Sequence, residues 1–265
     1  MSSVRSLPLR RRPRSRARDA HLRHERELRL AGFRRVAGID EVGRGCLAGP
    51  VVAAAVVLPE RPRLKGLRDS KVLARARREA LYELILDRAE AVGVGCVEVD
   101  TIDRINILQA TKLAMRQAVE RLAPTPDHLL IDALRLPVVD LPQRAIIDGD
   151  AISASIAAVS IVAKVTRDRI CDEMDDRYPA YGFRRNKGYG TPLHLYALGE
   201  AGPCEWHRRS FAPVRTMLLG QQLSFDLASI TIDHDVDDEE ALAQLAAAAD
   251  ADVTDLDEME IEPQS

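Results

Sequence analysis

Hydrophobic residues fall along this chain in two kinds of run. Short runs in which almost every residue is apolar are typical of buried strands, and longer stretches with an apolar residue every three or four positions are typical of amphipathic helices. Strands are expected at 34–45 and 50–59, joined by a glycine-rich bend. The second of them, PVVAAAVVLP, is too continuously apolar to face water on either side. The pattern predicts a buried hairpin.

Strands and helices alternate after this hairpin. Further strands are expected at 93–99, 128–134 and 144–150, and helices at 20–31, 74–91, 100–123 and 152–174. Asp19 and Gly32 have the residue types that begin and end the first helix, and Pro124 ends the third. The last helix is rich in Ala and Ser, which allow close approach to a sheet. We predict an α/β fold with a mixed sheet covered by helices on both faces.

Charge is distributed unevenly along the 265 residues, although the net charge is only -3. Residues 1–37 carry twelve Arg against three acids, and the part after Arg215 carries fourteen acids and no Lys or Arg. Segments of such composition bury too little apolar surface to fold alone. We therefore expect a basic N-terminal arm with a short helix at 1–33, one folded domain at 34–222, and an acidic, disordered tail at 223–265.

The cysteines and the apolar runs indicate in which cellular compartment the protein is expected. The four cysteines are scattered without a C-x-x-C pair, which favours a reduced cytoplasm over a zinc knuckle or a disulfide framework. No apolar run approaches the ~18 residues of a membrane span. The Arg-rich start indicates a solvated arm more than a targeting segment. We expect a cytoplasmic protein.

Four acids, Asp40, Glu41, Asp132 and Asp150, lie at or just after the ends of predicted strands. Any one of them has a simple alternative role as a cap of a strand or turn. Together they would repel one another unless a cation neutralised them, so their convergence implies a metal. A set of oxygen ligands without His or Cys favours Mg²⁺ or Mn²⁺ over zinc.

The adjacency of Asp40 and Glu41 is a geometric difficulty. Neighbours on a regular strand point to opposite faces, so we expect the strand to end or bulge there, with Gly43 and Gly45 permitting the break. A pair of ions about 3.5–4 Å apart, one reached by each side chain, removes the difficulty. Two such ions would clamp a phosphodiester. A P-loop is not indicated, because GRGCLAGP lacks the Lys-Ser/Thr pair that grips nucleotide phosphates.

A series of sequence blocks resembles type 2 ribonuclease H, bacterial ribonuclease HII. The blocks follow the order and approximate spacing of that family from about Arg34 to Leu219. They are AGIDEVGRGCLAGPVVAAAVVL, LRDSK, IDRINILQATKLAM, SIAAVSIVAKVTRDR, YPAYGFRRNKGYGTPLH and HRRSFAPV. The resemblance implies a ribonuclease H-like fold, a mixed β-sheet flanked by helices, plus a C-terminal helical segment.

The resemblance also implies the reaction. Asp40, Glu41 and Asp132 match the metal-binding acids of the family, and Asp150 matches its fourth active-site carboxylate. The implied activity is two-metal hydrolysis, with Mn²⁺ or Mg²⁺, of the RNA strand of RNA/DNA hybrids. It includes cuts 5′ to single ribonucleotides in duplex DNA and leaves 3′-hydroxyl and 5′-phosphate ends. The resemblance further implies a protein that is monomeric and does not associate with a membrane.

Substrate contacts are implied in the same way. Gly43, Arg44 and Gly45 match the motif whose backbone approaches the ribose 2′-hydroxyl, the group that distinguishes RNA from DNA. Tyr189 matches the tyrosine that stacks on the sugar after the ribonucleotide. Further expected contacts with phosphate or the groove are Ser70, Lys71, Asn106, Lys164 and Arg167. Taken alone, the turn could serve only the hairpin, Tyr189 could pack a loop, and Lys71 could be a solvated surface charge.

Two positions depart from the family pattern. Ala133 follows Asp132 where a glycine is usual, and the block DGD has Asp148 where a lysine is usual. Asp148 either points away from the site or increases its affinity for cations, so the relative importance of Asp148 and Asp150 stays open.

Two alternative functions are a nucleic-acid-binding protein on this fold that has lost catalysis, and another ribonuclease H-like enzyme such as a recombinase or transposase. The presence of all four acids argues against the first. The second needs further DNA-binding domains, for which the chain has no room. His194 and His207 are not assigned as catalytic, and His207 is expected to pack the C-terminal segment.

Overall fold

A computed structural model of the chain describes residues 20–68 and 70–220. The predictions for the arm up to Asp19 and for the acidic tail lie outside these residues. Within them, five strands form one sheet in the order β3-β2-β1-β4-β5. The strands are β1 (Val36–Val42), β2 (Val51–Val57), β3 (Ala91–Val97), β4 (His128–Asp132) and β5 (Gln143–Ile146).

The pairing of these strands makes the sheet mixed. β2 runs antiparallel to both β1 and β3, whereas β4 runs parallel to β1 and to β5. Every residue of β2 is buried, as its continuous apolar run predicts. The predicted hairpin and the predicted α/β fold are confirmed.

Helices connect and cover the strands. They are α1 (Arg23–Leu30), α2 (Arg75–Arg88), α3 (Val99–Ile105), α4 (Ile107–Glu120), α5 (Gly149–Ile152), α6 (Ala154–Arg177), α7 (Phe183–Asn186), α8 (Pro192–Ala201) and α9 (Ala212–Leu218), with short 3₁₀ turns η1 (Ser70–Val72) and η2 (Pro179–Tyr181). Within the described ranges, no helix has the length and apolar character that crossing a bilayer requires.

One helix was predicted wrongly. The continuous helix expected at 100–123 is two helices, α3 and α4, which meet at Asn106. Asn106 has a positive φ of 64°, and its side-chain oxygen accepts the backbone N–H of Gln109 at 3.0 Å. A φ and ψ of 64° and 165° are not helical, and an Asn side chain caps a helix well, so this residue ends one helix and starts the next.

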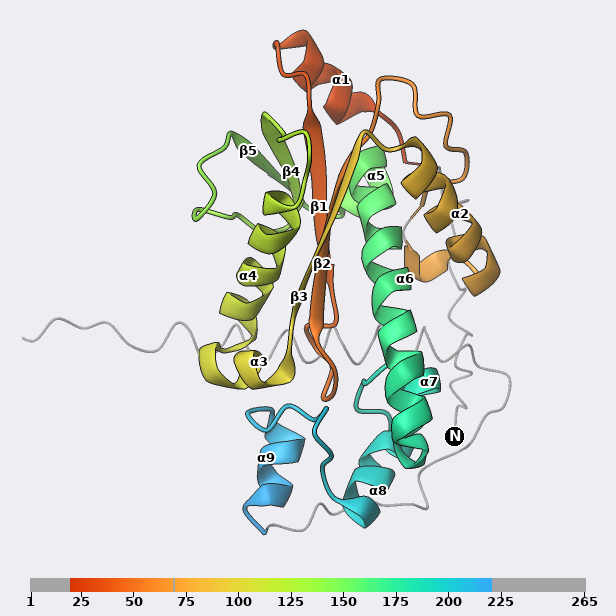
Figure 1. Cartoon of the computed structure of the whole chain (residues 1–265), viewed down its shortest axis with the longest axis vertical. Helices are drawn as coiled ribbons and strands as arrows, with labels where there is room; N and C mark the ends of the chain where they lie inside the picture. Colours follow the sequence, from red (N-terminus) through yellow and green to blue (C-terminus); the bar gives the residue numbers. More distant parts are fainter. Residues whose placement is uncertain (1–19, 69, 221–265) are drawn as a thin grey trace, which may run out of the picture.

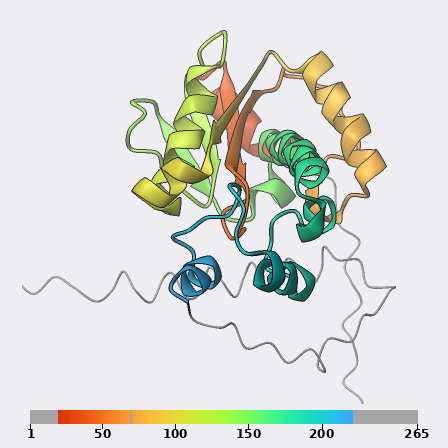
Figure 2. The same ribbon diagram turned by 60° about the horizontal axis from the view of Figure 1, so that its bottom comes forward.

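The helices form layers on the two faces of the sheet (Figure 1). α4 packs on one face, and α6 packs on the other with α2 outside it, as the view along α6 shows (Figure 2). Close approach depends on glycine: a Cβ at Gly38 would overlap the backbone of Ser155 in α6, and one at Gly95 would overlap Ala114 in α4. α8 and α9 lie below the sheet, beyond the turn between β1 and β2 (Figure 1).

The short N-terminal helix packs against the start of α6. Leu28 belongs to the apolar core on the α6 side of the sheet. The buried Glu25 carboxylate accepts the Ser153 hydroxyl at 2.7 Å and the backbone N–H of Ser155 at 2.8 Å. α1 thus fixes the junction of α5 and α6. As expected from Gly32, whose φ is 102°, the helix ends just before that residue.

Candidate active site

The sheet brings two of the four acids to neighbouring positions, and a third joins them from a helix. Ile39 is the register partner of Ile131 across the parallel pair β1 and β4, so Asp40 and Asp132, the next residues, lie side by side. Both continue the face that carries Gly38 and Leu130 and is covered by α6. Asp150 joins them from the first turn of α5. Parallel neighbours therefore deliver their acids to one place.

Glu41 reaches the site differently from the way the sequence suggested. β1 neither ends nor bulges at Asp40 and Glu41, because its pairing with β2 continues regularly to Val42. The expected break comes afterwards, at Gly43, whose φ is 92°. Glu41 consequently starts on the opposite face from Asp40, and its carboxylate lies 3.2 Å from the guanidinium of Arg44. The two acids therefore leave the strand from opposite faces.

Asp40 lies within electrostatic range of the other three acids. Burial raises the pKa of Asp40 well above its usual range, and the nearby charges of Glu41, Asp132 and Asp150 raise it further. Burial also raises the pKa of Glu41, with Asp132 adding to this and Arg44 opposing it. Like charges held together in a buried place disfavour ionisation unless a cation balances them.

The donor set fits a divalent metal, although the side chains do not yet converge on one point. Within residues 20–68 and 70–220, no three His, Cys, Asp or Glu side chains are grouped closely enough to hold an ion. Two of the carboxylates bond locally: Asp40 accepts the N–H of Glu41 at 2.7 Å, and Asp132 accepts that of Gly149 at 2.9 Å. These acids still lie close enough together to affect one another's pKa. Oxygen donors of this kind suit Mg²⁺ or Mn²⁺.

The structure distinguishes the two acids of the DGD block. Asp150, which is partly buried, is among the groups that raise the pKa of Asp40. Asp148 is exposed, with a φ of 54° at the start of α5. Ala133 also has a positive φ, of 48°, which is the backbone region that a glycine would adopt freely.

Two buried arginines lie beside the glycine-rich turn after β1, and one of them, Arg208, bonds it directly. Arg208 donates to the carbonyl oxygens of Gly43, Arg44 and Gly49. Arg167 lies directly beneath Gly43, where a Cβ would overlap its Nε, and it is 1% exposed. The expectation that Arg167 lines the groove is wrong, because its guanidinium is buried among the carbonyls of Ala48, Pro50 and Lys187. The role of Arg208 had no local signal in the sequence beyond the block HRRSFAPV.

Tyr189 lies next to the turn. The backbone N–H groups of Leu47 and Ala48 both donate to the carbonyl oxygen of Gly188. The pKa of the Tyr189 phenol is raised mainly by the neighbouring Cys46 thiol and, to a smaller extent, by burial. Two segments more than a hundred residues apart are thereby joined, so Gly43–Gly45 and Tyr189 belong to one surface.

Two buried histidines support this surface from below. His194 Nδ1 lies 2.7 Å from the carbonyl oxygen of Tyr189, and its Nε2 lies 3.1 Å from Nε2 of His207. Because a carbonyl only accepts, His194 carries its proton on Nδ1, and His207 must donate from Nε2. His207 Nδ1 then accepts the backbone N–H of Cys204 at 3.0 Å. This matches the expected packing role of His207.

The other expected contacts are less uniform. Ser70 is buried and its hydroxyl pairs with that of Ser160 at 2.8 Å. Lys164 pairs with Asp168 at 3.1 Å. Lys71 and Asn106 are exposed. Lys71 and Asn106 are therefore better placed to meet a substrate phosphate than the Ser70 hydroxyl is.

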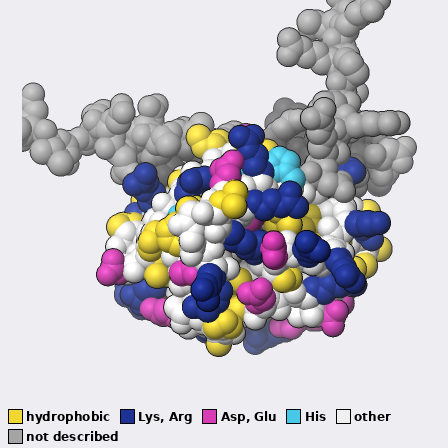
Figure 3. Space-filling model, turned by 90° about the horizontal axis from the view of Figure 1, so that it is seen from above, with side chains coloured by type: hydrophobic (Ala, Val, Ile, Leu, Met, Phe, Trp, Pro, Cys, Tyr) yellow, Lys and Arg dark blue, Asp and Glu magenta, His cyan; other side chains and the backbone are white. Residues whose placement is uncertain are grey.

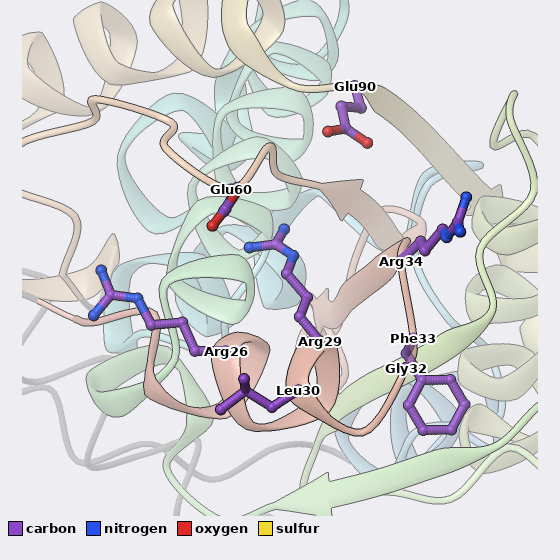
Figure 4. Close-up of a pocket in the computed structure, with 8 residues that line it drawn as sticks. All are labelled: Arg26, Arg29, Leu30, Gly32, Phe33, Arg34, Glu60 and Glu90. Atoms are coloured by element: carbon purple, nitrogen blue, oxygen red, sulfur yellow. The ribbon is translucent and has the colours of Figure 1, made fainter.

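A separate pocket of about 750 Å³ lies at the other end of the sheet. It is lined by residues of α1 and by those just before β1, just after β2 and just before β3, and Arg29 extends toward Glu60 within it (Figure 4). On the face seen from this end, Lys and Arg side chains are interspersed with acids (Figure 3). The pocket lies at the start of β1, whereas the clustered carboxylates lie toward its end. The candidate site is therefore not in this pocket.

Comparisons with known proteins agree with this arrangement. The model of the family Ribonuclease HII matches residues 37–214. A ribonuclease HII of Geobacillus thermodenitrificans is 59% identical over 197 residues, which are 74% of this chain and 76% of the relative. One of Desulfitobacterium hafniense is 56% identical over 200 residues, which are 76% and 77% of the two chains. The solved structure of ribonuclease H2 from Pyrococcus horikoshii OT3 is similar with a TM-score of 0.60 at 28% identity, covering 69% of this chain and 96% of that one.

Proposed function

This chain belongs to the ribonuclease HII family, and from this membership we propose that it cuts 5′ to single ribonucleotides in duplex DNA as well as within the RNA strand of RNA/DNA hybrids. The membership itself makes the protein a metal-dependent endonuclease that hydrolyses phosphodiester bonds of RNA paired with DNA. The proposed products carry 3′-hydroxyl and 5′-phosphate ends.

One observation carries the proposal above all others. The carboxylates on β1 and β4 lie within a few residues of a turn that is held by the buried Arg208 and in which Arg44 and Gly45 are partly exposed. The acids proposed to bind the metal and the turn proposed to contact the sugar are thus adjacent in the chain. Cleavage that depends on a neighbouring 2′-hydroxyl is the reaction such an arrangement suits.

The proposed metal site consists of Asp40, Glu41, Asp132 and Asp150. Two divalent ions, Mn²⁺ or Mg²⁺, would supply an activated water and stabilise the departing oxygen. The chain itself keeps the four carboxylates close enough to raise the pKa of Asp40. It also uses Arg44 to offset the charge of Glu41. The site therefore attracts cations while limiting the repulsion on one of its acids.

The proposed substrate contacts are Gly43, Arg44, Gly45 and Tyr189, with Lys71, Asn106, Lys164 and Ser70 toward the phosphates. The turn would meet the 2′-hydroxyl through backbone groups, and the ring of Tyr189 would stack on the next sugar. Cys46 and Gly188 connect the turn with the Tyr189 loop. They would keep the backbone of the turn and the ring of Tyr189 at a fixed spacing.

We also infer that the protein acts as a monomer in the cytoplasm. All four cysteines are free thiols, which fits a reducing compartment.

Cleavage of three labelled duplexes tests the proposal. An RNA/DNA hybrid, a DNA duplex with one ribonucleotide, and plain DNA are incubated with Mg²⁺ or Mn²⁺, and the ends are mapped. We expect cuts in the first two only, with 5′-phosphate ends. Cutting of plain DNA, or no cutting at the single ribonucleotide, would contradict the proposal. Binding of all three without any cleavage would favour the alternative of a catalytically inactive binding protein.

A further inference from the structure

Arg208 makes an unusual number of bonds to the turn that follows β1. Its side chain is fully buried, and its three nitrogens each donate to a backbone carbonyl oxygen. Nη2 lies 2.6 Å from Gly43 O, Nη1 lies 2.7 Å from Arg44 O, and Nε lies 3.0 Å from Gly49 O. The planar guanidinium therefore fixes two successive peptide groups of the turn at once.

Contacts on either side hold Arg208 itself in place. Its backbone N–H donates to Leu47 O at 2.8 Å, and its guanidinium lies 5.0 Å from the centre of the Phe211 ring. The next two residues, Arg209 and Ser210, each donate a backbone N–H to the carboxylate of Asp103 in α3 at 2.9 Å. Arg208 is thus positioned by the protein without any substrate.

These bonds decide where the amide groups of the turn point. In a planar trans peptide, the C=O of one residue and the N–H of the next point in opposite directions. Because Arg208 draws the carbonyls of Gly43 and Arg44 toward itself, the N–H groups of Arg44 and Gly45 point away from it. Among the described residues, no protein oxygen accepts either of these two N–H groups. Arg44 and Gly45 are partly exposed, so a ligand can approach this part of the turn.

We propose that Arg208 is a positioning residue that aims the amides of Arg44 and Gly45 at the 2′-hydroxyl of the substrate. The inference rests on the proposed function and deepens it, since it assigns the discrimination between ribose and deoxyribose to a residue that touches neither sugar. Two donors held in a fixed direction favour a sugar that offers an acceptor oxygen there. A turn free to rotate its peptides would lose this preference.

Arg208→Lys tests the inference. A lysine keeps the charge but has one point donor group in place of a planar fork, so it cannot hold all three carbonyls. The affinities for a single-ribonucleotide duplex and for an all-DNA duplex of the same sequence are measured in EDTA, where nothing is cut. We expect the preference of the parent protein for the ribonucleotide to fall about tenfold in the variant, with affinity for plain DNA unchanged.

Arg167→Lys is the matched control. Arg167 is also buried and also donates to three carbonyl oxygens, but none of them belongs to Gly43, Arg44 or Gly45. We expect this variant to lose stability and keep the preference. An unchanged preference in Arg208→Lys, or an equal loss in both variants, would overturn the inference. Absence of any preference in the parent protein would instead count against the proposed reading of the 2′-hydroxyl, and against this inference with it.

A second measurement uses the unaltered protein and decides the question if Arg208→Lys does not fold. Hydrogen exchange of the Arg44 and Gly45 amides is followed in the free protein and with each duplex. We expect fast exchange in the free protein and with plain DNA, and exchange slowed about tenfold or more by the ribonucleotide duplex. Protection already present in the free protein, or equal with both duplexes, would show that these amides do not face the sugar.

Discussion

Gly43 and Arg44 give their carbonyl oxygens to a buried cation, Arg208, whereas Asp40, a few residues earlier in the chain, is surrounded by groups of its own sign. The turn is held by hydrogen bonds that the protein supplies itself. Within the carboxylate cluster, Glu41 is paired with the guanidinium of Arg44.

This difference separates what the fold supplies from what a ligand must supply. A turn with satisfied carbonyls keeps its shape without ions, because its hydrogen-bond donors come from the protein itself. A buried group of carboxylates costs free energy until a cation arrives, and this cost becomes affinity for the cation. We therefore expect the turn Gly43–Gly45 with Tyr189, called the reading half of the site, to be organised in the free protein. The four carboxylates Asp40, Glu41, Asp132 and Asp150, called the cutting half, should depend on divalent ions.

Asp40→Asn removes one charge from the cutting half and has the largest expected effect. We expect kcat/KM on an RNA/DNA hybrid to fall by a factor on the order of 10³, or about 4 kcal/mol. Without ions the variant should melt at a higher temperature than the parent, because repulsion in the cluster is relieved. Addition of Mn²⁺ should stabilise the parent more than the variant. Cleavage rates and melting curves with and without the ion measure both effects.

Asp148→Asn provides the matched control for this change. Asp148 is also an acid at the end of a strand, but it is exposed and its backbone angle suits Asn equally well. We expect rates and ion-dependent melting close to those of the parent. If Asp148→Asn removed activity as fully as Asp40→Asn, the assignment of Asp150 to the cluster would be wrong.

Gly43→Ala breaks the reading half without changing a charge. The residue has a φ of 92°, and a Cβ would overlap the buried guanidinium of Arg167. Left-handed strain and overpacking together should cost about 3 kcal/mol of unfolding free energy. Urea unfolding measures it. Gly199→Ala in α8, where a Cβ meets nothing within 4 Å, should be neutral or stabilising. Equal losses in both variants would show that the turn has no special constraint.

The sequence predicts this comparison only in part. The hairpin and the acids were predictable because apolar runs and their ends are local features, and parallel strands bring their ends together. The bonds from Arg208 to Gly43 were not, since they join positions 165 residues apart. The regular course of β1 past Glu41 was also missed, because local glycines mark where a strand can break and not where it does. The helix break at Asn106 was missed for a similar reason, because the apolar pattern of α3 and α4 continues across that residue.

The histidine pair under Tyr189 predicts a pH dependence. Burial, and His194 beside it, lower the pKa of His207 from 6.5 to about 3. Between pH 6.5 and about pH 3, His207 is therefore protonated in the unfolded chain and neutral in the folded chain. Stability is then complete above pH 6.5 and is lost as the pH falls toward 3, by about 2 kcal/mol at pH 5. Urea unfolding between about pH 8 and pH 5 measures this loss.

His207→Asn isolates that contribution. The Asn side-chain oxygen can still accept the N–H of Cys204, but the group does not titrate in this range. We expect the variant to be less stable at neutral pH and to lose clearly less stability on acidification. An acid dependence equal to that of the parent would assign the effect to other groups, such as carboxylates.

Ala133→Gly has the smallest expected effect and tests whether strain helps the cutting half. Ala133 has a φ of 48° directly after Asp132. Relief of left-handed strain should exceed the added entropy of the unfolded chain, so we expect a gain of about 0.5–1 kcal/mol in unfolding free energy. Ala80→Gly, in the middle of α2, should instead lose about 1 kcal/mol. Because the N–H of Gly149 holds the Asp132 carboxylate, cleavage should stay within about twofold of the parent. A more stable Ala133→Gly variant with about tenfold slower cleavage would show instead that the strained residue aims Asp132.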